Sequence, residues 1–465
     1  MKAAARLGTA LVWAALLAGC SSFSDRMAPA EEAFAAGRYD EAATLLRQLK
    51  RDDAKNAHVY ALNLGVGELA LGATGNARGE WRFARDRMEE LSTTDVTTWF
   101  GAVLTDDTAL DYPGEDYERI LVRAMLALAD LLGGGGDADA FALQVLEKQL
   151  EIMESFADES GARPKQAYRL VAFGSYLRGI LNEDNPLTRS VAEREFRRVL
   201  ELAPEFPHAR ADLARVTEGR FCAPGHGVVH VLALVGRGPF KVEAEEPASA
   251  AALGIAQWAW GLHRDRVTFP NLTSVKIPAL AVRGDNPTEA LVEIDGQPAG
   301  QTATVTDVNA TALQQFETVK SWIVARAILR RVFKITAQEG VKEATDAVVD
   351  HQGGQYGWII RFVKNLFIDI LGLLWTSAER ADTRCWSLLP ASFQALRLEL
   401  PAGEHTLTLA ASQNGRAAGA TPPVTIRVRD GFSTYVVALL PTLAGGPPPL
   451  ASDAPEERGA PALQP

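Results

Sequence analysis

Three side chains of types that bind zinc recur at intervals of four residues, namely Cys222, His226 and His230. On a helix this spacing would bring them onto one face, close enough for a single ion. The glycine and valine residues between them favour a strand instead, and a strand would spread the three side chains over about 26 Å at about 3.3 Å per residue. We therefore predict no metal site here, and the sequence suggests no other cofactor.

A second candidate group is Asp382, Arg384 and Trp386, which alternate along the chain. In a strand these side chains would point the same way, so that Asp382 and Arg384 could pair beside the indole ring. We favour a structural corner, and the alternative is a pocket in which Arg384 holds an anionic group and Trp386 stacks on a sugar. Lys241 and Glu243 alternate in the same manner after a Gly-Pro step, and we expect them to form a buried pair.

A third group is basic and has helical spacing. Arg326, Arg330 and Lys334 follow one another at intervals of four residues, with Arg331 beside them. On a helix they would form a basic stripe in an otherwise acidic protein. The favoured interpretation is a solvated helix face. The alternative is contact with an anionic polymer or with phosphate headgroups.

The side-chain arrangements that mark hydrolytic enzymes are not found in the sequence. It has 7 histidines and no Ser-His-Asp order with an elbow motif. The glycine run at 133–136 is not followed by Gly-Lys-Ser/Thr, so it predicts a turn and not a phosphate cradle. We predict that the chain is not an enzyme. A cell-wall-acting enzyme or activator, with Arg384 and Trp386 in a groove, is the alternative.

The N-terminal residues have the pattern of a secretory signal. Lys2 and Arg6 are basic, Leu11–Leu17 is an apolar stretch too short to span a bilayer, and small residues lead to Cys20. This pattern resembles the signal of bacterial lipoproteins, in which the cysteine is lipidated and becomes the first mature residue. The resemblance implies a signal peptide over residues 1–20 and a lipid anchor, with acyl chains such as palmitate, on Cys20. The alternative is an ordinary cleaved signal that contains a cysteine by chance.

The composition narrows the classes of partner. The 465 residues carry 47 Lys+Arg against 58 Asp+Glu, and this acidic balance argues against nucleic-acid binding.

The apolar segment Tyr356–Trp375 is interrupted by charged residues that are costly inside a bilayer. We expect it to be a mostly buried helix, with a helix in the membrane interface as the alternative. Cys222 and Cys385 could form a disulfide in an oxidising compartment or remain buried thiols.

Residues 30–220 show paired helical patterns, preceded by an expected tether over residues 21–29. Glycine breaks separate the members of most pairs, and proline follows the last helix. Pairs of this size resemble tetratricopeptide repeats, with a generic array of helical hairpins as the alternative, and stacked pairs would form a solenoid. The expected helices are Ala30–Ala36, Tyr39–Leu49, Ala57–Leu71, Ala77–Leu91, Tyr117–Leu132, Ala138–Phe156, Gln166–Leu181 and Arg189–Leu202.

Residues 221–442 combine strand and helix patterns. Alternating apolar and polar residues predict an antiparallel sheet, and Asp295-Gly296 predicts a tight turn. Helical spacing from Asp307 to about Val349 predicts a long inserted helix. The expected fold class is therefore α+β, with a helical-repeat solenoid followed by a β-rich domain and a disordered tail over residues 443–465. The expected strands are Val228–Val235, Val275–Val282, Leu291–Ile294, Gln301–Val305, Ala395–Leu400, Thr406–Leu409, Val424–Arg429 and Thr434–Leu440.

Two segments of the second half carry a family resemblance. Gly236–Glu243 has the form Gly-x-x-Pro-x-Lys-x-Glu, and Ala381–Pro390 has the form Ala-Asp-x-Arg-x-Trp-x-x-Leu-Pro. They resemble a family of uncharacterised bacterial lipoproteins in which a tetratricopeptide-like region precedes an α+β half. The family implies this domain order and brings no catalytic assignment. Cys385 departs from its pattern, since a small polar residue is expected there.

These patterns predict a membrane-anchored protein that faces the periplasm. Ser21, and not Asp, follows Cys20, and by the usual sorting pattern of lipoproteins in cells with two membranes this resemblance implies the outer membrane. We expect a protein-interaction scaffold or adaptor in cell-envelope assembly, secretion or polysaccharide handling, which binds other envelope proteins through its helical-repeat surface. A further alternative is a structural component of a surface apparatus, in which the hairpin at Asp295 and Gly296 offers a pairing edge.

Overall fold

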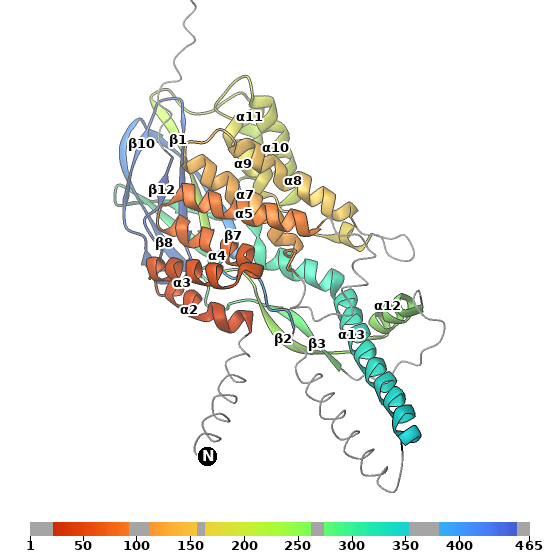
Figure 1. The fold of residues 1–465 in the computed structure, drawn as a ribbon. Coiled ribbons are helices and arrows are strands. Elements are labelled where there is room, and N and C mark those ends of the chain that lie inside the picture. Colours follow the sequence, from red (N-terminus) through yellow and green to blue (C-terminus); the bar gives the residue numbers. More distant parts are fainter. Residues whose placement is uncertain (1–21, 93–110, 156–162, 262–273, 353–380, 453–465) are drawn as a thin grey trace, which may run out of the picture.

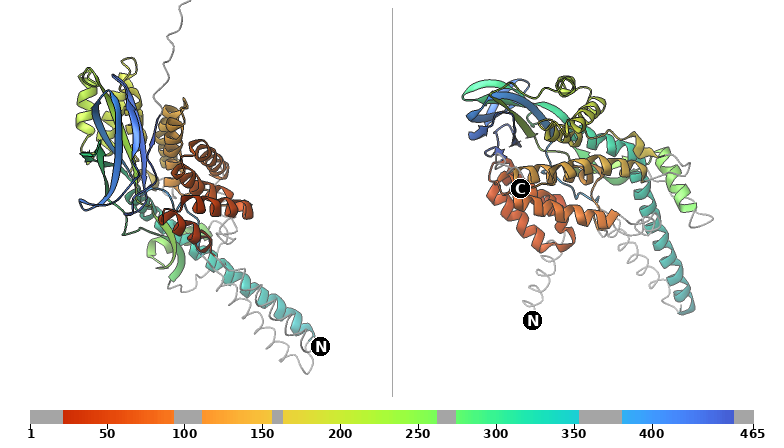
Figure 2. Two further views of the ribbon diagram at one scale, coloured as in Figure 1. Left: turned by 90° about the vertical axis from the view of Figure 1, so that its left-hand side faces the viewer. Right: turned by 90° about the horizontal axis from the view of Figure 1, so that it is seen from above.

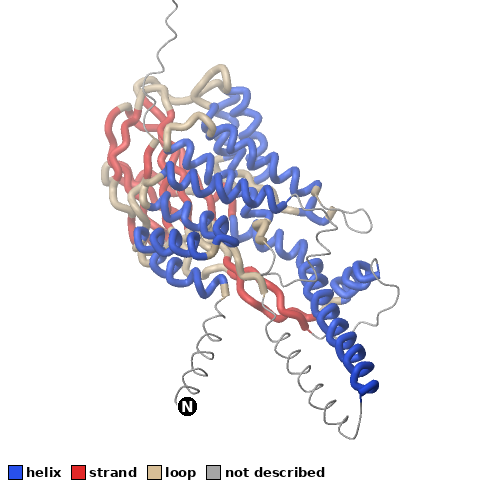
Figure 3. The backbone as a smooth tube through the Cα atoms, viewed as in Figure 1, coloured by secondary structure: helices blue, strands red, loops and turns tan. Residues whose placement is uncertain are grey.

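The computed structural model describes residues 22–92, 111–155, 163–261, 274–352 and 381–452, with the backbone alone for 257–261 and 332–352. A layer of helices packs against two stacked β-sheets, and one long helix projects from the body (Figure 1). Figure 3 shows the strands gathered on one side of the body and the helices on the other. The expected α+β class is therefore confirmed, whereas the likeness of the helices to tetratricopeptide repeats stays a prediction.

The helical layer is built from consecutive helices that each pack on the next. Figure 2 shows the first of these helices beside the strands of the sheets. The members are α2 (Phe23–Ala35), α3 (Tyr39–Asp52), the short helix η1 (Ala54–Asn56), α4 (Ala57–Ala70), α5 (Thr74–Ser92), α7 (Asp116–Leu132), α8 (Ala138–Glu154), the short helix η3 (Pro164–Ala167), α9 (Phe173–Asn182), α10 (Arg189–Leu202) and α11 (Ala209–Thr217).

Burial divides the helices into an inner and an outer set. In α4, α7 and α9 nearly every side chain is buried, whereas α3, α5, α8 and α10 bury one face only. Phe173 of α9 contacts Phe393 of the sheet with 4.6 Å between the ring centroids. The helices and the first sheet therefore share one core, and the two expected domains, 30–220 and 221–442, are not separate bodies at this contact.

The first sheet has the strand order β12-β11-β1-β7-β6 and the second has β10-β8-β4-β5, with β9 paired to β8. Most pairs are antiparallel as expected, and β1 with β11 is a parallel exception that the sequence did not predict. Parallel neighbours need a crossover connection, and the chain between these two strands supplies it. The strands are β1 (His226–Val235), β4 (Glu289–Ile294), β5 (Gln297–Gln301), β6 (Ala303–Asp307), β7 (Ser392–Pro401), β8 (Gly403–Gln413), β9 (Arg416–Ala420), β10 (Val424–Val428), β11 (Ser433–Leu440) and β12 (Leu450–Ala451).

Strand β1 contributes side chains to two hydrophobic cores. Val229 and Val231 face the second sheet, whereas Leu232 and Leu234 face the helices. Successive side chains of a strand point to opposite faces, so a strand covered on both sides is apolar throughout, as the sequence of β1 predicted. His230 shares the parity of Leu232 and therefore faces the helical layer.

A third core lies outside the body. Strands β2 (Phe240–Pro247) and β3 (Ser274–Ala281) form a separate ribbon, which packs with α12 (Ala250–Gly261) and α13 (Val308–Gln352). Helix α13 has 45 residues, or about 68 Å at about 1.5 Å per residue. We term this ribbon and these two helices the arm, which projects from the body in both Figure 1 and Figure 2.

Two predictions at the ends of the chain are wrong over the described residues. The expected tether begins a helix, because α2 starts at Phe23 and buries Met27 on the same face as Phe34. Pro29, the last residue of the expected tether, lies inside this helix. The expected disordered tail holds β12, which pairs with β11 through Val437 and Leu450. Residues 453–465 lie outside the described chain.

Two internal boundaries also differ. The helix expected at Gln166–Leu181 starts only at Phe173, because the backbone N–H groups of Val171 and Phe173 donate to the side chains of Gln149 and Thr306. The strand expected at Gln301–Val305 is divided between β5 in one sheet and β6 in the other. The turn at Asp295-Gly296 is confirmed, with φ of 53° and 73°.

Candidate functional site

The two segments that carry the family resemblance lie against each other in the structure. The Gly238 N–H donates to the Leu389 carbonyl at 2.5 Å, and the Ala381 N–H donates to the Glu243 carboxylate at 3.0 Å. With α4 and α7 they enclose a set of polar side chains between the helices and the sheets. We term this set the junction cluster, and its members are Asn56, Asn63, Tyr112, Glu115, Glu118, Lys241, Asp382 and Arg384.

Gly238 permits the close approach of the two segments. A Cβ atom at this position would lie 2.8 Å from the backbone oxygen of Leu389, closer than real Cβ atoms come to other heavy atoms. Arg283 fixes the same place, because its Nη1 donates to the Gly238 carbonyl at 2.8 Å. Only a residue without a side chain therefore fits at position 238, which is one of the variable positions between Gly236 and Pro239 of the Gly-x-x-Pro element.

Arg384 and Asp382 form a buried ion pair in the junction cluster. Arg384 Nε donates to Asp382 Oδ1 at 2.8 Å, and its Nη2 donates to Asp382 Oδ2 at 2.7 Å. Nη1 donates to Asn56 Oδ1 at 3.0 Å, and the guanidinium lies over the ring of Tyr112. Burial alone would raise the pKa of Asp382, but Arg384 and Lys241 outweigh it and lower this pKa. The bidentate pair fixes the conformation within residues 382–384, and the hydrogen bond to Asn56 holds this segment against η1.

Lys241 supplies the second buried cation. Its Nζ pairs with the Glu115 carboxylate and lies 4.8 Å from the centre of the Tyr112 ring. Burial by itself would lower the pKa of Lys241, but the carboxylates of Glu115, Asp382 and Glu118 raise it above the usual value, so the amine stays charged. The expected pairing of Lys241 with Glu243 is not formed, since Glu243 pairs instead with Lys276 at 2.7 Å.

Glu118 lies at the centre of the cluster. It accepts hydrogen bonds from the Trp386 N–H at 2.6 Å, the Glu115 N–H at 3.0 Å and the Tyr112 hydroxyl at 2.7 Å. The side chain is completely buried, and this burial raises the pKa of its carboxyl group despite the opposing charge of Lys241. Whether it is protonated or ionised, the Glu118 carboxyl group can accept from the Trp386 N–H, and this bond ties α7 directly to the segment 381–390.

The structure decides between the two interpretations of Arg384 and Trp386. Arg384 is 3% exposed and Trp386 is 0% exposed, so neither side chain faces an open groove. The Trp386 ring packs against Trp81 of α5, with 6.4 Å between the centroids. The pocket that would hold an anion or a sugar is not formed by these residues, and they make the structural corner instead.

Both cysteines in the described chain are free thiols. Cys385 is buried in the junction, and burial raises its pKa to about 12, so the thiol is neutral. Asn63 holds the backbone beside it, accepting from the Leu388 N–H at 3.0 Å. Cys222 is half-buried, and its thiol donates to the His226 carbonyl at 3.1 Å. Cys20 lies outside the described residues.

A second polar cluster surrounds His230 between β1 and the helices α9 to α11. His230 Nε2 lies 2.9 Å from Glu183 Oε1, and Arg215 donates to the other oxygen at 2.7 Å. Burial alone would raise the pKa of Glu183, but His230 and Arg215 lower it to about 2. His226 and His230 lie four residues apart on the same strand β1. The described residues contain no group of three or more side chains able to hold a metal ion.

The basic residues of α13 do not form one exposed stripe over the part that the structure describes. Arg330 is 2% exposed and lies beside the third core, whereas Arg326 is half-buried. Arg331 donates to the Ser274 carbonyl at 3.1 Å and so ties α13 to β3. The side chain of Lys334 is outside the described residues. The expectation of a solvated face is therefore wrong for Arg330, which serves the packing of the arm.

Sequence reasoning found Lys241, Asp382, Arg384 and Trp386 but missed their partners on the helices. Glu118 and Asn63 lie within apolar helical patterns, and a polar residue in such a position is a weak signal of a buried network. The sequence does not show which distant residues come into contact, and Glu118 and Trp386 are 268 positions apart. Only the tertiary fold brings them together.

Comparisons with known proteins identify no relative: no family model, no curated protein and no solved structure matches this chain. Among the described helices none has the length and apolar character that a bilayer crossing requires. The segment Tyr356–Trp375 lies outside the described residues.

Proposed function

We propose that this chain is a lipid-anchored protein of the cell envelope that binds other envelope proteins and does not catalyse a reaction. The pattern that ends at Cys20 supports the anchor and the periplasmic location, with the outer membrane as the expected site. The observation that carries the scaffold role is the use of the charged motif residues. Arg384 pairs with Asp382 and Lys241 pairs with Glu115, and both cations are buried, so these side chains hold the fold together and are not presented to a substrate.

The partner surface we propose is the outer face of the helical layer. The inner helices α4, α7 and α9 are covered by the chain's own first sheet, which occupies the face that a free solenoid would offer. The outer helices α5 and α8 expose Phe83 and Leu150, which are 44% and 50% accessible. Large apolar side chains amid charged residues are typical anchors of a protein interface.

The hairpin alternative is less well supported. Strand β5 lies at the edge of the second sheet, as a pairing edge requires. It contains Pro298 and Gly300, however, and the register shifts within its pairing to β4. Proline and irregular register are features that protect an edge strand from adding another chain.

The test is photo-crosslinking of the full chain in growing cells. A photoreactive phenylalanine at Phe83 or Leu150 should give discrete adducts with other envelope proteins, which mass spectrometry then identifies. The matched control is Phe432, which is also 44% exposed but lies in the turn between β10 and β11. Adducts from position 432 alone, or none from the helical positions, would contradict the proposed partner surface.

A further inference from the structure

Helix α2 begins almost directly after the proposed anchor residue. Ser22 caps the helix, since its hydroxyl accepts from the Asp25 N–H at 3.1 Å and its own N–H donates to the Asp25 carboxylate at 2.8 Å. Two chain steps separate Ser22 from Cys20, and they reach about 7 Å even when fully extended. A lipid on Cys20 therefore holds the start of α2 within about 7 Å of the attachment point.

The first turns of α2 are fixed to the rest of the body. Phe23 stacks on Tyr60 of α4 with 5.0 Å between the ring centroids. Arg26 pairs with Asp53 at 2.8 Å, and the Ser24 N–H donates to the Thr383 hydroxyl at 3.4 Å. The helix thus joins three parts of the fold at its start. The short connection to Cys20 consequently constrains the whole body and not only one helix.

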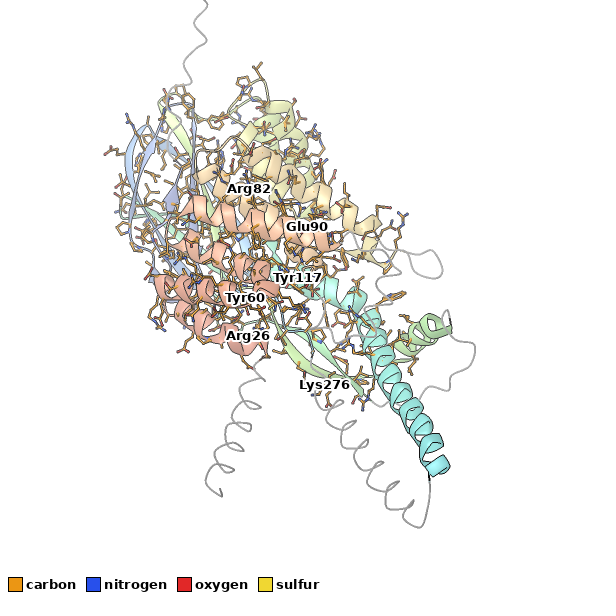
Figure 4. The ribbon with its side chains drawn as sticks, in the orientation of Figure 1. Arg26, Tyr60, Arg82, Glu90, Tyr117 and Lys276 are labelled. Carbon is orange, nitrogen blue, oxygen red and sulfur yellow. The ribbon has the colours of Figure 1, made fainter. Side chains whose placement is uncertain are left out.

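Several exposed elements surround this point. The connection between α3 and α4 lies beside it through Asp53, and Lys55 in that connection is exposed. Figure 4 shows Arg26 and Lys276 on the same side of the molecule, and the arm projects from that side as well. We term the first turn of α2 and the connection 51–57 the basal edge.

We propose that the basal edge rests on the headgroups of the bilayer and that the arm extends along the same lipid surface. This inference rests on the proposed function, because it needs the lipid on Cys20. With so short a connection the body cannot turn freely above the membrane. The lipid attachment and the arm provide two separated points of support, and they define one orientation. The outer helical face then stands at a fixed height and direction for its partners.

The opposite edge of the helical layer provides a reference. Helices α9, α10 and α11 lie at the end of the helical layer away from α2, and the connection between α9 and α10 lies there with them (Figure 1). Leu187 in that connection is 90% exposed.

The test uses the full-length lipidated protein in vesicles of phosphatidylethanolamine and phosphatidylglycerol. Spin labels are attached to Lys55→Cys or, as the matched control, Leu187→Cys, each in a Cys222→Ser background. A lipid that carries a nickel chelate on its headgroup relaxes labels near the surface. We expect several-fold stronger relaxation at position 55 than at position 187. Equal relaxation at both positions, with the lipid confirmed by mass, would overturn the fixed orientation and leave the proposed anchor intact.

A linker variant separates the short connection from any intrinsic affinity for lipid. Twenty Gly and Ser residues inserted between Ser21 and Ser22 would extend the root-mean-square reach to about 25 Å. The relaxation at position 55 should then fall to the level of position 187 while the protein still floats with the vesicles. Relaxation that survives the insertion would contradict the length argument. A chain that carries no lipid at all would overturn both the orientation and the anchor.

Discussion

Removal of the Asp382 charge tests whether the junction cluster holds the helices and sheets together. In Asp382→Asn the side-chain shape is kept, but Arg384 and Lys241 lose a carboxylate whose side chain is only 15% exposed. Breaking one partner of a buried ion pair costs about 3–5 kcal/mol of unfolding free energy. The control is Glu41→Gln, because Glu41 pairs with Arg38 at 2.7 Å on the surface, where both side chains are at least half exposed. Surface pairs of this kind contribute about 0–1 kcal/mol.

The assay is equilibrium unfolding in urea, followed by far-ultraviolet circular dichroism and by tryptophan fluorescence. Trp81 and Trp386 both lie at the junction, so fluorescence reports the loss of this contact. We expect Asp382→Asn to lower the unfolding free energy by at least three times as much as Glu41→Gln. A double variant, Asp382→Leu with Arg384→Met, should recover part of the loss, since apolar replacement of both partners removes the unpaired charge. Equal, small effects of the buried and exposed substitutions would refute the assigned role of the cluster.

The remaining predictions concern pH and packing. The pKa of Glu118 is raised in the folded state above the ordinary value of 4.5, so its contribution to stability is complete below that value and is lost as the pH rises through the folded-state pKa. Glu118→Gln should therefore gain unfolding free energy relative to the native chain as the pH is raised from about 4 to about 7. Urea unfolding at each pH measures this, and a difference in unfolding free energy that does not change with pH would contradict the predicted sign. Gly238→Ala should cost about 1–3 kcal/mol, because the new Cβ would meet the Leu389 oxygen at 2.8 Å. The control is Gly79→Ala at an exposed position of α5, where no atom lies within 4 Å of the new Cβ. It should stabilise the chain by about 0.5–1 kcal/mol in the same thermal or urea unfolding. Equal losses of stability in both variants would show that the junction is not tightly packed.

Local patterns in the sequence predicted most helices and strands. Helix α10 begins at Arg189 and ends at Leu202 as expected, because its apolar spacing is helical and Pro204 follows it. Strand β1 was recognisable from its continuous apolar run. The first half of α2 was missed because residues 21–29 were expected to form a tether, whereas Phe23 and Met27 are buried on the apolar face of the helix.

The junction cluster was predictable only in part. The alternation of Asp382, Arg384 and Trp386 indicated an ion pair beside an indole, and the structure contains that ion pair. The sequence could not show that Glu118 accepts from the Trp386 backbone, because no local spacing connects positions so far apart. The burial of Arg330 was equally hidden, since charge patterning favours a solvated position unless tertiary packing overrides it.

The most direct measurement is the mass of the N-terminal peptide from protein extracted from cell envelopes. If the anchor is formed, the mature chain begins at Cys20 and its peptide carries the added mass of acyl chains. The Cys20→Ser variant should then lose this mass and leave the membrane fraction. A native peptide that spans residue 20 without modification, or a Cys20→Ser protein that stays with the envelope at unchanged mass, would contradict the lipid anchor.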